Sequence, residues 1–198
     1  MADYSIIADI STVILQYLRE KLCPLLITSP NQIDAAVPAE QDQDYILGLY
    51  LYDLQEEGML GVPAMRRYGQ GKLKKIPKSY ALYYTIFVNA SSQTSVKALD
   101  GQKIIGKCAQ IMGDLAVLKA SDLQPWLEEK EPPIAVVSPK MELEDKVRVW
   151  QAVDKPYRNC LFYKVSPVLL SSEVVLDITR VREARFSLEE QEKEERHD

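Results

Sequence analysis

A short run of basic residues is the part of this sequence best suited to binding another molecule. Residues 66–78, the basic arm, hold six basic side chains and no acidic one. Lysine and arginine around a tyrosine can neutralise phosphates and stack a base, or they can bind an acidic protein surface. On a protein of net charge -5, one such patch favours a protein partner over a solvated loop, and both over nucleic acid. The candidate binding residues are Arg66, Arg67, Tyr68, Lys72, Lys74, Lys75 and Lys78.

Residues suited to catalysis or metal binding are scarce. The one histidine, His197, is the penultimate residue, which removes most general-base, nucleophilic-triad and histidine-metal schemes. Cys23, Cys108 and Cys160 are far apart in the sequence, so they suggest neither a disulfide framework nor a set of metal ligands. The sequence therefore predicts a protein that is not an enzyme and that carries no metal or cofactor.

Phosphate-binding loops and activated carboxylates are also missing. The segment G-Q-G-K at residues 69–72 has the wrong spacing for a phosphate loop and does not join a strand to a helix. Glu56 and Glu57 fall in a polar segment where nothing would raise their pKa, so we interpret them as solvated surface. Cys108 falls on the apolar stripe of a predicted helix, which indicates a core position.

Two apolar strands are predicted to flank the basic arm. Residues 44–54, D-Y-I-L-G-L-Y-L-Y-D-L, place eight uncharged residues between two aspartates, a pattern typical of a mid-sheet strand buried on both faces. Residues 80–89 are rich in aromatic and β-branched side chains and are predicted to pair with that strand. The 25-residue connection, 55–79, contains glycines and prolines that exclude a long helix. We therefore expect an extended arm or open hairpin that reaches out from the sheet edge.

Helical spacing of apolar residues predicts two amphipathic helices. The first spans residues 5–22, with Asp3 or Ser5 as its cap, and the second spans residues 100–118. Gly106 and Gly113 suggest that the second helix approaches the sheet or the first helix closely. Pro167 is expected to mark a strand end or an edge bulge. A short helix is predicted at 143–153, and further strands are predicted at 25–28, 134–137, 160–165 and 174–178.

Length and composition indicate one domain with a tail. A chain of 198 residues with 46% hydrophobic content can fill one core, and the order of elements predicts an α+β domain over residues 1–182. This domain has a mixed, mainly antiparallel sheet flanked by helices. Residues 183–198 form a charged tail, and residues 188–198 alone carry -4 of the net charge. The rest of the chain is nearly neutral, so no general attraction to nucleic acid or anionic lipid is expected.

The N-terminal segment has neither the basic start of a signal peptide nor an uninterrupted apolar run. Asp9, Gln16 and Arg19 interrupt its apolar residues. We expect synthesis in the cytoplasm and no membrane contact.

Residues 150–168, W-Q-A-V-D-K-P-Y-R-N-C-L-F-Y-K-V-S-P-V, resemble the tail-terminator, or cap, family of contractile injection systems. That family has a tryptophan at the end of a short helix, then P-Y-R, then a strand with an internal tyrosine and a following proline. The strands expected at 47–54 and 77–84 are similar to its first two long strands. Asn159 and Cys160 stand where the family has proline and serine. The matching positions are Trp150, Pro156, Tyr157, Arg158, Tyr163 and Pro167.

The resemblance implies a structural assembly protein. Copies of it, six in the family pattern, form a ring that caps the distal end of the inner tube and anchors the last sheath ring. Its partners are then further copies of itself and the tube and sheath proteins of a particle that is released or membrane-attached. We assign the basic arm to an acidic surface on the tube, the sheath or a neighbouring subunit. A nucleic-acid-binding module that uses residues 66–78 is the alternative.

Overall fold

The structure is a computed structural model, which describes residues 4–38, 44–58, 65–69, 71–89, 98–118, 123 and 132–178. The predicted tail, 183–198, lies outside the described residues. The elements are α1 (Ile6–Leu22), β1 (Ile33–Ala35), β2 (Leu47–Glu56), β3 (Met65–Arg67), β4 (Lys72–Lys75), β5 (Lys78–Val88), α2 (Ala98–Asp114), β6 (Val117–Leu118), β7 (Ile134–Val137), α3 (Leu143–Gln151), β8 (Cys160–Leu170) and β9 (Val175–Asp177).

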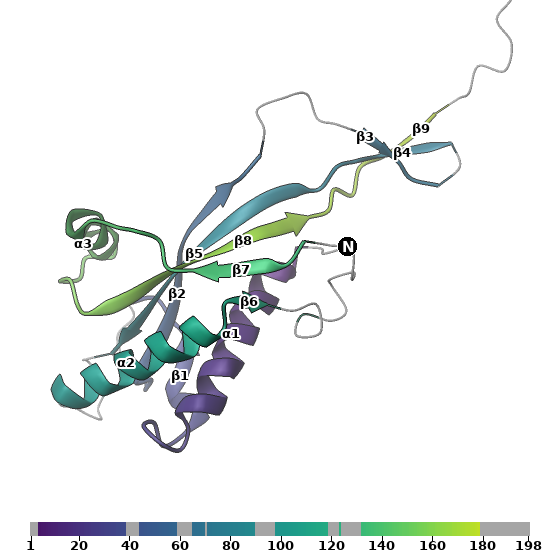
Figure 1. The fold of residues 1–198 in the computed structure, drawn as a ribbon. Helices are drawn as coiled ribbons and strands as arrows, with labels where there is room; N and C mark the ends of the chain where they lie inside the picture. The colour runs from purple at the N-terminus through teal and green to yellow at the C-terminus, as the bar shows by residue number, and fades with distance from the viewer. Residues whose placement is uncertain are drawn as a thin grey trace, which may run out of the picture.

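Two sheets organise these elements. A six-stranded sheet has the order β1-β2-β5-β8-β7-β6, and a three-stranded sheet has the order β3-β4-β9. Only the β1–β2 pair is parallel among the described strands. Both α1 and α2 lie along one side of the large sheet, and the small sheet stands apart (Figure 1). The predicted α+β fold with a mixed, mainly antiparallel sheet is confirmed, as is the pairing of the two long strands that flank the arm.

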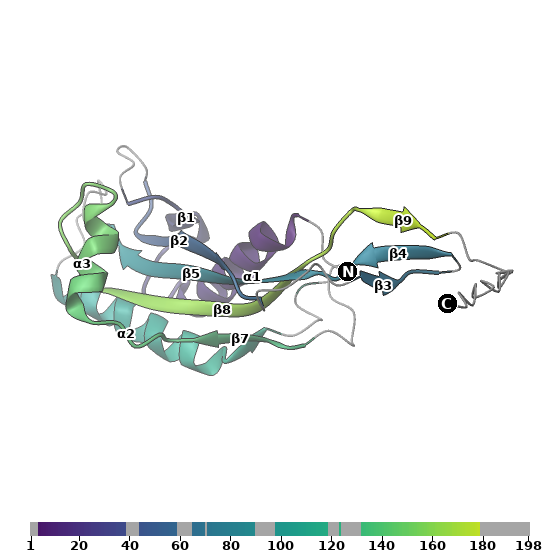
Figure 2. The same cartoon turned by 90° about the horizontal axis from the view of Figure 1, so that it is seen from above.

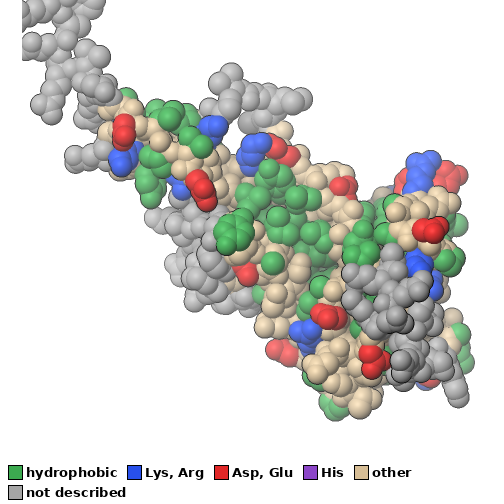
Figure 3. Space-filling model, turned by 180° about the vertical axis from the view of Figure 1, so that it is seen from behind, with side chains coloured by type: hydrophobic (Ala, Val, Ile, Leu, Met, Phe, Trp, Pro, Cys, Tyr) green, Lys and Arg blue, Asp and Glu red, His purple; other side chains and the backbone are tan. Residues whose placement is uncertain are grey.

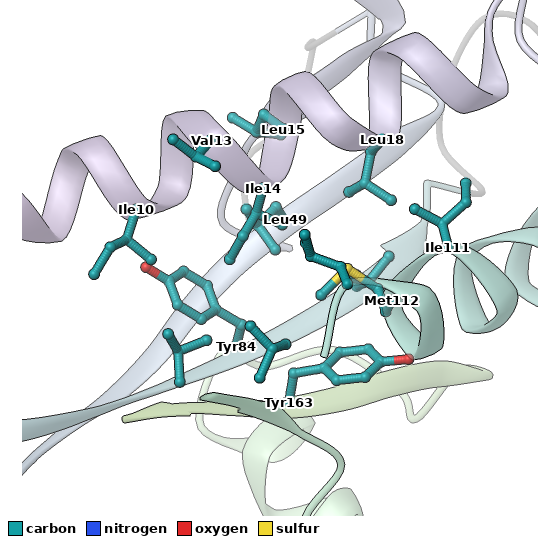
Figure 4. Packing of buried hydrophobic residues seen from close by; sticks show 14 of the residues in the cluster. Ile10, Val13, Ile14, Leu15, Leu18, Leu49, Tyr84, Ile111, Met112 and Tyr163 are labelled. Carbon is teal, nitrogen blue, oxygen red and sulfur yellow. The ribbon is translucent and has the colours of Figure 1, made fainter. Parts of the chain in front are cut away.

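The core lies between the large sheet and the two long helices. Side chains of α1 and α2, including Ile14 and Met112, meet Tyr84 of β5 and Tyr163 of β8 (Figure 4). The Tyr84 hydroxyl group shares a 2.8 Å hydrogen bond with the hydroxyl group of Ser11 on α1, so this buried phenol is not left unpaired. Burial raises the pKa of Tyr84 to about 12. Cys108 is fully buried on α2, as predicted.

The other face of the large sheet is covered at one end by α3. Trp150 is buried there, and its indole N–H donates a 3.3 Å hydrogen bond to the Cys160 sulfur. The Phe87 ring packs edge-on against Trp150 at 5.5 Å between centroids. Phe87 in turn lies over Gly48, where an added Cβ would come within 2.4 Å of the phenyl ring. Gly48 therefore leaves the space that lets this aromatic cluster close on the sheet.

Two sequence expectations are wrong, one about helix packing and one about secondary structure. Gly106 and Gly113 are exposed, and nothing among the described residues lies within 4 Å of a Cβ built on either, so they do not mark a close approach of α2. Residues 25–28 form turns instead of a strand, because the amides of Leu26 and Ile27 both bond to the Leu22 carbonyl and extend the end of α1. The first strand, β1, follows only after these turns.

Strand β8 is longer than the sequence indicates. It was expected over residues 160–165, with Pro167 at its end or in an edge bulge, and it runs to Leu170. Its pairing with β5 shifts register between Tyr80 and Leu82, and Pro167 lies in the resulting bulge. Proline lacks the N–H that a regular ladder requires, and a bulge removes that requirement. The continuation of β8 past this point leads the chain toward the small sheet.

The N-terminal cap of α1 differs in detail from the expectation. Ser5 occupies the cap position but makes no side-chain bond to the helix backbone. Its hydroxyl group instead donates a 2.7 Å hydrogen bond to the Asp9 carboxylate. Asp3 lies outside the described residues.

Candidate interaction surface

The basic arm folds as part of the small sheet. Strands β3 and β4 form a hairpin, and β9 pairs with β4 as a third strand. The predicted open hairpin is therefore found, and the strand expected at 174–178 is found as β9. Seen from above, β3, β4 and β9 extend away from the helices at the far end of β5 and β8 (Figure 2). We call these three strands the arm sheet.

The arm sheet continues the longest ladder of the body. Strand β4 leads into β5 after Ile76 and Pro77, and β8 leads into β9 within a few residues. The β5–β8 ladder ends where Lys78 lies opposite Leu170, and the β4–β9 pair begins with Lys74 opposite Val175. Pro77 cannot donate a ladder hydrogen bond, which accounts for a break at this point. The arm is thus an outward extension of the central strands.

A tight turn joins the two strands of the hairpin. The Tyr68 amide donates to the Lys72 carbonyl at 2.9 Å, which closes the turn. Gly69 and Gly71 have φ angles of 69° and 75°, in the region that favours glycine. Gly69 and Gly71, from the segment already excluded as a phosphate loop, therefore belong to a hairpin turn.

The predicted binding residues do not share one surface. Residues directly opposite one another in an antiparallel ladder lie on the same face. Arg66 is opposite Lys74, and Lys72 shares that face two residues along the strand. Arg67 is opposite Leu73 on the other face, which Lys75 also shares. The arm sheet therefore carries positive charge on both of its faces.

Several of these cations have partners within the chain. The Lys74 ammonium lies 5.4 Å from the centroid of the Tyr68 ring, and the Lys72 ammonium lies 4.0 Å from the Asp177 carboxylate. Arg67 and Lys75 form no ion pair with any described residue. The exposed arm thus offers basic side chains that remain available to an acidic partner.

Lys78 is the first residue of β5 and lies where the body meets the arm sheet, a junction that we call the neck. Its ammonium lies 2.8 Å from the Glu56 carboxylate, and this hydrogen bond raises the pKa of Lys78. On the neighbouring strand, Lys164 of β8 pairs with Glu57, and that hydrogen bond raises the pKa of Lys164. Glu56 and Glu57, interpreted from sequence as solvated surface, are therefore partners in the ion pairs of the neck. Exposed ion pairs of this kind are screened by solvent and contribute little stability.

Sequence reasoning did not identify the apolar surface of the arm. The strand at β9 was expected, but its exposure was not. Figure 3 shows hydrophobic side chains among the charged ones on the arm. The exposed fractions range from 39% to 52%, and the residues are Val174, Val175, Leu176 and Ile178.

Other kinds of site find no support in the described part of the chain. No group of three or more histidine, cysteine, aspartate or glutamate side chains there is placed to hold a metal ion. None of the helices in the same residues is both long enough and apolar enough to cross a membrane.

Comparison with known proteins relates the chain to injection particles. One similar solved structure is the PVC sheath/tube terminator of an extracellular contractile injection system in its extended state, with a TM-score of 0.64, 20% identity, and coverage of 96% of this chain and 65% of that one. Another is the tube-terminating cap of the anti-feeding prophage, with a TM-score of 0.57, 17% identity, and coverage of 91% and 61%. The chain spans less than two thirds of either structure. A search of curated proteins finds no match.

At these identities the two structures establish a shared fold, and they agree with the resemblance to tail terminators drawn from residues 150–168. The family itself is established by sequence. Residues 9–183 match the model of the Pvc16 N-terminal domain, so this chain belongs to the Pvc16 N-terminal domain family.

Proposed function

We propose that this protein is a structural assembly component that caps the distal end of the inner tube of a contractile injection system and anchors its last sheath ring. The observation that carries the proposal is the family match over residues 9–183. The fold adds support, because it is shared with structures described as a sheath/tube terminator and a tube-terminating cap. Catalysis is not part of the proposed role.

In this proposal a ring of identical copies caps the tube, and the family resemblance suggests that the ring has six copies. A body with a separate projecting arm suits head-to-tail contacts, in which one surface of each copy meets a different surface of the next and rotation closes the ring. One side of the ring then matches the terminal ring of the tube, and further tube subunits cannot add. Residues 1–182 make up the assembling domain in this proposal, and residues 183–198 are a dispensable tail.

The basic arm is proposed to contact an acidic surface of the particle. Its support is the positive charge on both faces of a sheet that projects from the body. The nucleic-acid alternative gains less from this geometry. Tyr68 is the one aromatic side chain of residues 65–78, whereas proteins that bind single strands combine a basic groove with several stacking aromatics.

The proposal places the protein in the cytoplasm at synthesis and then in a particle that is released or membrane-attached. Negative-stain electron microscopy of particles made with and without this chain tests it. Loss of the chain is expected to give tubes of uncontrolled length or sheaths that fail to stay extended. Unchanged particles would refute the capping role, and a mass measurement of the purified protein would count the copies in the ring.

A further inference from the structure

One face of the arm sheet combines apolar and basic side chains. Leu73 of β4 lies opposite Arg67 of β3 and opposite Leu176 of β9, so these three side chains share a face. Lys75 is two residues from Leu73 on the same strand and therefore shares that face as well. We call this surface the mixed face. Its members are Arg67, Leu73, Lys75, Val174, Leu176 and Ile178.

The mixed face presents both its charges and its apolar groups to solvent. Arg67 and Lys75 are exposed and form no ion pair with any described residue. Leu176 is half exposed, because the arm stands clear of the helices (Figure 2). On the opposite face, by contrast, the two β4 lysines lie beside Asp177 and the Tyr68 ring. The mixed face is therefore the side of the arm that gains most from a covering segment.

One stretch of the tail has a sequence that can cover this face. Residues 186–192 read F-S-L-E-E-Q-E. In an extended segment Phe186 and Leu188 point to the same side, because side chains alternate along such a chain. Three carboxylates follow within four residues, at positions 189, 190 and 192. This order, two apolar side chains and then acidic ones, matches the apolar row and the cations of the mixed face.

The tail begins beside the mixed face. The Ile178 amide donates a 2.7 Å hydrogen bond to the Gly71 carbonyl, which holds the end of β9 against the hairpin turn. Residues 179–185 carry three arginines and one glutamate, so we assign them to a connection and not to the contact with the basic arm. The eight residues from 179 to 186 span up to about 26 Å, whereas β3 lies about 10 Å from β9 across the sheet. The acidic stretch can therefore reach both cations of this face within one chain.

A second copy of the arm fits this face less well. Two mixed faces packed together would set Arg67 and Lys75 of one copy against the same cations of the next, and like charges at short range disfavour such a contact. The tail of another copy has the right charge. A tethered segment, however, has an effective concentration in the millimolar range. The tail of the same chain is therefore favoured as the occupant.

We propose that residues 186–192 bind the mixed face of the same chain and shield it before assembly. The two apolar side chains of the segment cover the apolar row, and its carboxylates lie beside Arg67 and Lys75. The purpose of this shield rests on the proposed function, in which the arm binds an acidic surface of the particle. Because that surface must displace the tail, the apparent affinity of a free copy is lowered in proportion to the fraction of open chains. The tail stays dispensable for folding and for capping itself.

Chemical labelling of Lys75 measures the shield directly in the full-length protein. The rate at which an N-hydroxysuccinimide ester acetylates its amino group is followed by mass spectrometry, with Lys103 on α2 as an internal reference on the body. A neutral variant combines Glu189→Gln, Glu190→Gln and Glu192→Gln. The matched control combines Glu189→Asp, Glu190→Asp and Glu192→Asp, which keeps the charge of the segment.

We expect Lys75 to react about threefold or more faster in the neutral variant than in the unchanged protein, because loss of the contact opens most of the closed chains. The aspartate control should match the unchanged protein, and Lys103 should react equally in all. Phe186→Ser with Leu188→Ser keeps every charge and should also speed the labelling of Lys75, which a diffuse effect of charge would not do. Sodium chloride at about 0.5 M should reduce the differences, since it screens exposed charges.

Equal labelling of Lys75 in the unchanged protein and the serine variant would overturn the inference, even if the neutral variant differs. Protection of Lys75 that weakens on dilution would overturn it as well, because the tail would then come from another copy. Neither result touches the capping proposal, which particles made with and without the chain test separately. Unchanged particles together with a protected Lys75 would refute the proposed function and leave the contact between tail and arm standing.

Discussion

Strands β4 and β9 of the arm sheet extend β5 and β8 of the body, but the body strands are covered and the arm strands are exposed. Along β5 and β8 in the body, helices cover the strands, and side chains such as Tyr84 and Val165 are buried. Past the neck, β4 and β9 continue the ladder with both faces exposed, and apolar residues such as Leu176 meet solvent. The body can therefore owe its stability to its own core, whereas the arm has surface left to bury against a partner.

The largest expected loss of stability comes from the aromatic cluster of the body. Trp150→Ala should lower the free energy of unfolding by about 3–5 kcal/mol, because it empties the site where α3 packs on the sheet and leaves a cavity. Urea denaturation measures this change. A loss below about 1 kcal/mol would mean that α3 is not held by this cluster.

Two glycine substitutions should have opposite effects within the body. Gly48→Ala should cost about 1–3 kcal/mol, since its new methyl group would meet the Phe87 ring. Gly106→Ala on α2 has open space and should stabilise by about 0.5–1 kcal/mol, because alanine favours the helix. Denaturation of the two variants side by side checks the signs. The same sign in both would contradict the packing described here.

High pH should weaken the body through its buried phenols. Burial raises the pKa of Tyr84 to about 12, whereas an unfolded tyrosine ionises near pH 10. The contribution of Tyr84 to stability is therefore fully present below about pH 10 and is lost as pH rises toward 12. Tyr84→Phe removes this contribution, and it also costs about 1 kcal/mol at neutral pH through loss of the bond to Ser11.

The measurement is the urea midpoint between pH 9 and pH 11.5, where Tyr84→Phe should show the shallower decline. Tyr4→Phe is the control, because Tyr4 is exposed at the start of the chain. The neck ion pairs of Lys78 and Lys164 are also lost as pH rises through the raised pKa values of these lysines, but all three proteins share that change. Parallel declines in all three proteins would show that folding does not raise the pKa of Tyr84.

Local patterns in the sequence predicted most of the body. The strand at 134–137 has the predicted bounds, and α1 begins one residue after the expected start, because hydrophobic periodicity reports burial directly. Glycine and proline were less informative. Gly106 suggested a close contact but lies on an exposed helix face, and Pro167 allowed either a strand end or a bulge, of which the structure has the bulge. Deciding between such uses requires the neighbouring strand or helix.

The arm shows the same limit more strongly. Its charge and its hairpin followed from the sequence of residues 66–78, but the distribution of its cations over two faces depends on register, which the sequence did not give. The pairs Lys78–Glu56 and Lys164–Glu57 join positions far apart in the chain, so their ion pairs were not found. The mixed face of the arm sheet became evident only once β9 was placed beside β4.

The smallest expected change in stability accompanies the largest expected change in function. Reversal of charge in the arm, by Arg66→Glu, Arg67→Glu, Lys74→Glu and Lys75→Glu, should alter the free energy of unfolding by about 1 kcal/mol or less, because these side chains lie on the arm sheet outside the core. Capping should be abolished, as judged by tube length and sheath extension in electron micrographs. The control exchanges arginine and lysine at the same four positions and should cap normally, since it keeps the charge. If the reversed protein still caps, the basic side chains are not the contact, and binding at the arm would have to depend on its apolar side chains alone.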